Sequence, residues 1–133
     1  MKTFREIANE LNNTNVELTN ENRGEYAKAI KKLVPTVDGH ADLSDIAKKW
    51  LNTIARVIGT DSNELGKADR KVMARLLDVA ATIAENPTPR RIKTSKADYN
   101  RLVIDSKIEE LIHGRYRMMA KLESGEVVIY EIK

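Results

Sequence analysis

The sequence predicts a mainly helical α+β fold, with about four helices followed by one or two short helices and an antiparallel β-hairpin. Apolar residues recur at helical spacing through residues 1–86, whereas apolar and polar residues alternate over 115–133. Between these two patterns lies a basic segment, 87–94, that contains two prolines. With 133 residues the chain is long enough to bury one core. We therefore expect a single domain over 1–133, with a helical lobe, a connector and an α+β lobe at 95–133.

The first two helices are predicted from their ends. Thr3 and Glu6 form a capping-box pattern, in which each side chain accepts a hydrogen bond from the other's backbone, and an apolar stripe over residues 3–12 follows it. Asn22 is the expected cap of the second helix. Pro35 is expected to end that helix, because proline has no backbone N–H to continue the hydrogen-bond ladder.

The next two helices carry the clearest apolar stripes. Asp42 is the expected cap of the third helix and Gly59 its stop, with Trp50 in the middle of the buried face. The fourth helix is expected to begin somewhere over 61–67. It is expected to end at Asn86, which precedes a proline.

The α+β lobe is less clear at its start. Ser95 is the expected cap of a fifth helix that runs to about Leu102, although residues 102–104 are equally compatible with a strand. Ser106 and Glu109 form another capping-box pattern, which predicts a helix ending at Gly114.

The hairpin at 115–133 is predicted from its period-two pattern. With Gly125 in the left-handed position of a three-residue turn, Met118 faces Tyr130 on an apolar face that must pack on the helices. The other face is expected to point outward. It would expose Met119, Val127 and Ile129 as an apolar patch for a protein partner.

Composition limits the setting in which the chain works. It has no cysteine, which fits a reducing compartment, and no apolar stretch long enough to span a bilayer or of signal-peptide type. We expect the cytoplasm, or the interior of a virus particle assembled there. The 23 basic and 20 acidic residues give a net charge of +3. The whole excess lies in residues 90–133, which hold 10 basic and 7 acidic side chains.

The sequence contains no pattern that indicates catalysis. The only histidines, His40 and His113, are far apart; His40 lies in a glycine turn, and His113 is expected in the last turn of a helix. The acidic residues around His40 do not fit a calcium loop, because the twelfth position is Lys49. We expect no enzyme, metal, cofactor or small-molecule substrate, although carboxylates brought together by folding remain an alternative.

Basic residues gather in three places and predict nucleic acid as the first partner to test. Lysine and arginine side chains that meet in space bind phosphates without reading sequence. Tyr99 adds a ring that a base could stack on. The predicted contact residues are Lys67, Arg70, Lys71 and Arg75 on the fourth helix, Arg90, Arg91, Lys93 and Lys96 around the connector, and Arg115, Arg117 and Lys121 on the hairpin.

The order of elements over residues 67–133, ending in the hairpin Gly-Arg-Tyr-Arg…Glu-Ser-Gly-Glu-Val-Val-Ile-Tyr, resembles a winged-helix module. The resemblance implies that the third helix of the module, at 106–113, reads the major groove while the hairpin touches the backbone. Glu109 and Glu110 depart from that pattern, because carboxylates there would repel phosphates. Winged helices also dock proteins, and a protein-docking module is the alternative reading.

The opening residues Met1-Lys2-Thr3-Phe4-Arg5-Glu6 are similar to the start of the small internal head proteins of T-even-type phages. This resemblance covers six residues. It implies a phage-encoded accessory protein, either a virion component or an inhibitor of a host protein. Self-association is a further alternative, because a hairpin leaves an edge strand that another copy can pair with.

Overall fold

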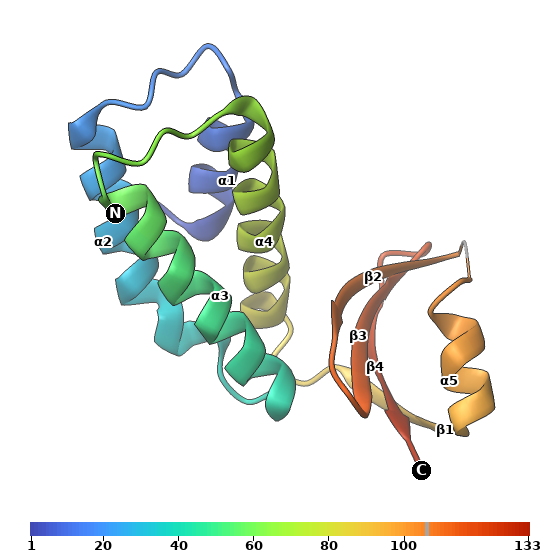
Figure 1. The fold of residues 1–133 in the computed structure, drawn as a ribbon. Coiled ribbons are helices and arrows are strands. Elements are labelled where there is room, and N and C mark those ends of the chain that lie inside the picture. The colour runs from blue at the N-terminus through green and yellow to red at the C-terminus, as the bar shows by residue number, and fades with distance from the viewer. Residues whose placement is uncertain (106) are drawn as a thin grey trace.

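The computed structural model describes residues 1–105 and 107–133. In chain order the helices are α1 (Phe4–Asn12), α2 (Asn20–Leu33), the 3-10 helix η1 (Val34–Val37), α3 (Asp42–Gly59), α4 (Lys67–Glu85) and α5 (Lys96–Leu102). The strands are β1 (Arg90–Thr94), β2 (Ile108–His113), β3 (Arg117–Leu122) and β4 (Val127–Ile132). Figure 1 shows α1, α2, α3 and α4 as one lobe and the sheet beside them, with α5 on the outer side of the sheet. The predicted α+β class is confirmed.

The capping box at the start of α1 is confirmed, but the cap of α2 is not the predicted residue. Thr3 and Glu6 exchange side-chain and backbone hydrogen bonds at 3.2 Å each. At the second helix, Thr19 is the cap, because its hydroxyl accepts the backbone N–H of Asn22 at 3.1 Å. The helix therefore begins earlier than the sequence predicts. Pro35 ends the α-helical ladder as expected, and the chain continues through η1.

The predicted cap of α3 is also wrong. Ala41 precedes the helix with φ of +53°, and Asp42 is the first helical residue. The Asp42 carboxylate instead binds the guanidinium of Arg117 on β3 at 3.0 Å. Trp50 was predicted to lie in the core, but it is only partly buried at the edge of the apolar cluster.

Two arginines hold the ends of the helical lobe in place by donating to backbone carbonyls. Arg23, buried on α2, donates to the carbonyls of Val57, Ile58, Thr60 and Asn63 at 2.8 to 3.2 Å, at the end of α3. Arg70 on α4 makes four similar bonds at 2.9 to 3.0 Å, to the carbonyls of Glu10, Leu11, Asn13 and Val16. Helix C-terminal carbonyls have no intrahelical donor, so these guanidinium groups satisfy acceptors that would otherwise be unpaired. Sequence patterns do not reveal this role, because each donor and its acceptors are far apart in the chain.

The hairpin prediction is confirmed in its register. Strands β3 and β4 pair Met118 with Tyr130 and Met119 with Ile129, and Gly125 in the turn has φ of +92°. The hairpin is the centre of a larger sheet, whose strand order is β1-β4-β3-β2. The free edges are therefore those of β1 and β2.

Two segments outside the hairpin add strands to the sheet; the sequence predicts an extended connector for the first and, wrongly, a helix for the second. Residues 90–94, expected to be an extended connector, form β1 and pair in parallel with β4. Residues 108–113, expected to be most of a capped helix, form β2 and pair antiparallel with β3, with an irregularity between residues 110 and 112. The expected cap of that helix, Ser106, lies outside the described residues. In β2, pairing with the hairpin overrides the local helical signal, because propensity is a weak determinant in short segments.

Both faces of the sheet are covered, so the predicted outward face is wrong. Met119, Val127 and Ile129 have exposed fractions of 0%, 9% and 1% and belong to the same apolar core as the helical lobe. The opposite face, with Met118 at its centre, packs against Tyr99 of α5. A sheet covered on both faces explains why its strands are apolar on both sides rather than on one.

Candidate functional site

The basic residues predicted on α4 separate into two kinds. Arg70 points inward and is fully occupied by the four carbonyls described above. Lys67, Lys71 and Arg75 are exposed, and in the part of the chain that the structure describes none of them has an ion pair. They follow one another at intervals of four residues and therefore line one face of the helix over roughly 12 Å.

The basic residues of β1 are largely neutralised by two glutamates. Glu131, only 5% exposed on β4, binds Arg91 at 2.7 Å and Lys93 at 2.8 Å. Arg117 from β3 also reaches it, at 3.3 Å. Arg90 pairs with Glu126 at 3.1 Å. The hydrogen bond from Lys93 is the main reason why the pKa of Glu131 lies below its ordinary value.

The tyrosine predicted to stack on a base is buried, whereas a tyrosine of the hairpin is exposed. Tyr99 was the expected stacking residue, but it is 2% exposed, lies 5.5 Å from the ring of His113 and donates to the carbonyl of Gly114 at 3.3 Å. Its ring therefore serves the core of the α+β lobe. Tyr116, which directly precedes β3, is 53% exposed and has the guanidinium of Arg115 over its ring at 5.2 Å.

One pair of predicted residues meets in space although 46 positions separate them in the chain. Arg75 on α4 and Lys121 on β3 line the same cavity, of about 220 Å³, between the helical lobe and the sheet. A neighbouring hollow of about 480 Å³ along α1 and α4 shares Arg75 and Asp78 with it and also contains Lys71. We call the two together the basic groove. Lys96, which is also exposed, lies on α5 outside the basic groove.

The electrostatics of the basic groove also depend on Arg5, a cation that the sequence did not single out. Arg5 on α1 binds the two carboxylate oxygens of Glu85 at 2.8 Å each and lies 3.5 Å from Asp78. This pairing with Arg5 lowers the pKa of Glu85, whereas burial raises the pKa of Asp78. Because Arg5 is occupied, Arg75 and Lys121 are the cations of this cavity left to meet an anion.

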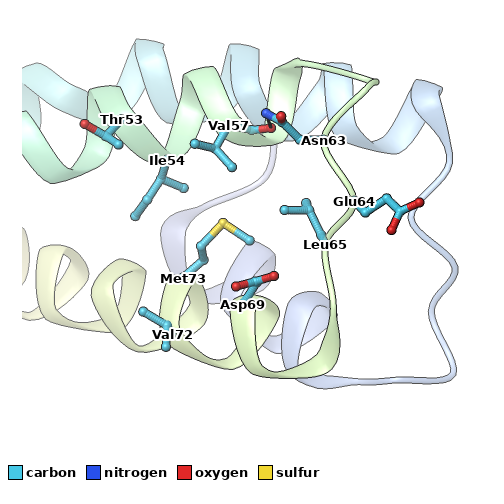
Figure 2. A pocket seen from close by; sticks show the side chains of 9 residues that line it. All are labelled: Thr53, Ile54, Val57, Asn63, Glu64, Leu65, Asp69, Val72 and Met73. Carbon is cyan, nitrogen blue, oxygen red and sulfur yellow. Dashed lines mark hydrogen bonds between the residues drawn. The ribbon is translucent and has the colours of Figure 1, made fainter.

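A further hollow lies between α3 and α4, and we call it the α3–α4 groove; Val72 of α4 borders both this groove and the basic groove. It measures about 450 Å³, within the range of ligand-binding clefts. Figure 2 shows Leu65 and Met73 pointing into it below the side chains of α3. Its apolar lining consists of Ile54, Val57, Leu65, Val72 and Met73, and its polar lining of Thr53, Asn63, Glu64 and Asp69.

The histidines do not form a site. His40 is 1% exposed and its Nε2 lies 3.1 Å from the carbonyl of Ile83, so this nitrogen carries the proton that is donated. Its Nδ1 is buried without a partner in the described part of the chain. Burial therefore favours the neutral ring and lowers the pKa of His40. His113 was expected at a helix end, but it lies in β2 against Tyr99.

Among the described residues, no group of three or more histidine, aspartate or glutamate side chains is arranged to hold a metal ion. No described helix is long and apolar enough to cross a bilayer.

Comparison with protein-family models, with curated proteins and with solved structures finds no match. The third helix that the winged-helix resemblance implies is the strand β2 instead. The function proposed below therefore rests on the surface residues and hollows described above.

Proposed function

We propose that this chain is a non-enzymatic binding protein that holds the phosphate backbone of a nucleic acid in the basic groove, in the cytoplasm or in a particle assembled there. The observation that carries the proposal is the meeting of Arg75 and Lys121 in one cavity. Lys67 and Lys71 extend the same line of positive charge along α4. Cations without carboxylate partners gain the most from binding a phosphate, because no existing ion pair has to be broken.

The site differs from the one that composition favours. The excess of positive charge lies in residues 90–133, yet Arg90, Arg91, Lys93 and Arg117 are already paired with carboxylates. A nucleic acid at that surface would have to compete with Glu126 and the buried Glu131. The proposed contact surface is therefore formed by α4 and β3 rather than by the connector.

Charge reversal on matched helices tests the proposal. One variant combines Lys67→Glu, Lys71→Glu and Arg75→Glu. The control is a single variant that combines Lys28→Glu, Lys31→Glu and Lys32→Glu, three exposed positions on α2. Both triple variants then have the same net charge. Each is titrated with single-stranded DNA, duplex DNA and RNA at two salt concentrations.

The wild-type protein should bind at low salt, with log K falling as log salt rises. The α4 variant should lose about tenfold or more in affinity relative to the control. The slope against log salt should fall by roughly two to three, because about one counterion is released per phosphate contact. Absence of binding at low salt, or equal losses in the two triple variants, would refute the proposal.

Protein docking is the second candidate function, and the α3–α4 groove is the observation that favours it. Val72 on its lip is 59% exposed, which is high for a valine side chain on a long helix. Docking at the previously expected patch is not proposed, because Met119, Val127 and Ile129 are buried against the helical lobe.

A further inference from the structure

The α3–α4 groove is an apolar hollow without a cover in the described chain. Its floor is made by Ile54 and Met73, which are nearly buried, and its rim by Leu65 and Val72, which are more exposed. Glu64, on the rim, is exposed and has no ion pair among the described residues. A complementary ligand would therefore present an apolar side chain with positive charge beside it.

The same chain exposes a segment of that kind at the end of α5. Ile104 is 82% exposed and Val103 is 40% exposed, so two branched apolar side chains stand side by side in water. Exposed cations flank them, Arg101 on one side and Lys107 on the other. We call residues 101–105 with Lys107 the α5 tip.

The charges of the α5 tip are free to reorganise. Arg101 meets Asp98 at 3.5 Å, with both side chains more than half exposed, so this pair contributes little. Lys107 is exposed and forms no ion pair among the described residues, and its backbone N–H donates to the carboxylate of Asp105 at 2.9 Å. Both cations can therefore turn towards an external carboxylate.

The α5 tip cannot fill the groove of its own chain. Tyr99 and Leu102 of α5 pack on the face of the sheet that points away from the helical lobe. Figure 1 accordingly shows the sheet standing between α5 and the helices α3 and α4. The apolar tip and the apolar groove lie on opposite sides of the molecule, so any contact between them joins two molecules.

We propose that the protein associates with itself head to tail, by inserting Ile104 of one copy into the α3–α4 groove of the next. Arg101 and Lys107 then face Glu64 and Asp69 on the rim of that groove. The two contacting surfaces differ, so every open assembly has a free tip at one end and a free groove at the other, and association continues into chains unless it closes into a ring. This inference does not depend on the proposed nucleic-acid function, because none of the cations that line the basic groove lines the α3–α4 groove.

Association through one inserted tip should be weak. Stable complexes bury on the order of 1,200 Å² or more in total, and two apolar side chains supply only a part of such an area. We expect a Kd on the order of 1 mM, so that the average mass in solution rises only in concentrated samples.

Two variants, each disabled in one surface, test the proposal. Ile104→Lys replaces the most exposed apolar side chain of the α5 tip with a cation, and Leu65→Lys places a cation on the rim of the α3–α4 groove. Tyr116→Lys is the matched control, because Tyr116 is also exposed but lies in neither surface. Average mass is measured by sedimentation equilibrium over a wide concentration range, and the circular dichroism spectrum of each variant checks that it is folded.

We expect the wild type and Tyr116→Lys to associate as the concentration rises. Ile104→Lys and Leu65→Lys should each remain monomeric. An equal mixture of Ile104→Lys and Leu65→Lys should then form dimers and nothing larger, because only one intact groove and one intact tip remain in each pair. A wild-type protein that stays monomeric at several millimolar would overturn the proposal. So would association that neither variant reduces, or a mixture that restores no dimer.

A synthetic amphipathic peptide rich in leucine and lysine extends the test to a foreign partner. If wild type does not self-associate but binds this peptide, and Leu65→Lys abolishes the binding, the occupant of the groove is another protein and the self-association is wrong.

Discussion

Replacing the buried Arg23 with alanine should destabilise the protein more than the loss of any single exposed charge. The side chain is 6% exposed and supplies donors to four carbonyls where α3 ends. Two of these acceptors keep another donor, since Val57 and Thr60 also accept hydrogen bonds from Asn63. The carbonyls of Ile58 and Asn63 rely on Arg23 in the part of the chain that the structure describes.

The magnitude follows from these two acceptors. A buried acceptor left without a partner, here the carbonyl of Ile58, costs about 1–3 kcal/mol. The carbonyl of Asn63 belongs to an exposed residue that water can reach, so its loss costs less, and the free energy of unfolding should fall by about 3 kcal/mol in total. For a chain of 133 residues this corresponds to a fall in Tm of roughly 10 °C.

Urea unfolding followed by circular dichroism gives the free energy, and a thermal melt gives Tm. Arg56→Ala is the control, because Arg56 is an exposed arginine on α3 and its removal should change stability by less than about 0.5 kcal/mol. If Arg23→Ala were no less stable than Arg56→Ala, the role assigned to Arg23 at the end of α3 would be wrong.

Three further predictions concern other polar or strained positions. Glu131→Gln should lower stability by about 2 kcal/mol at neutral pH. Because the folded pKa of Glu131 lies below 4.5, its contribution is present above that pH and is lost as the pH falls further; urea titrations at several pH values measure this. The pKa of His40 is held below 6.5, so wild-type stability should fall as acid is added below pH 6.5, and His40→Gln should show a flatter profile between roughly pH 6.5 and pH 5. Ala41→Gly should raise Tm by roughly 3 °C, because φ of +53° is strained for alanine; an unchanged or lower Tm would contradict this.

The helical lobe was predictable because its signals are local. Thr3 and Glu6 are three residues apart, and the apolar stripes of α3 and α4 repeat within single helices. The hairpin was predictable for the same reason, since Gly125 and the alternating residues around it fix the register of neighbouring strands. In each case the interacting residues lie close together in the sequence, where periodicity and turn chemistry can be read.

The rest of the fold depends on contacts between distant segments. The basic residues 90–94 form a strand only because β4, more than thirty residues later, offers a partner edge. Nothing near Ile108 indicates that β3 will pair with it, and a capping-box pattern points to a helix instead. The faces of the hairpin were misjudged because period two does not reveal whether one face or both faces are covered.

The candidate site was only partly predictable. Lys71, Arg75 and Lys121 were named from charge, and the structure brings Arg75 and Lys121 into one cavity. The sequence did not reveal that Glu131 occupies three of the other predicted cations, or that Arg70 is a structural donor. Pairing of this kind is decided by tertiary proximity, which a single sequence does not contain.

The position of β4 between β1 and β3 has a consequence for the order in which the molecule assembles. β4 is the last described element in the chain, yet it forms the only link between β1 and the other strands. During synthesis the four long helices leave the ribosome first and can pack through contacts that are comparatively near in sequence. The segment that becomes β1 has no strand to pair with until β4 has been synthesised and lies between β1 and β3. Parallel pairing over such a separation is slow, so we expect refolding to show a fast helical phase followed by a slower phase in which the sheet closes.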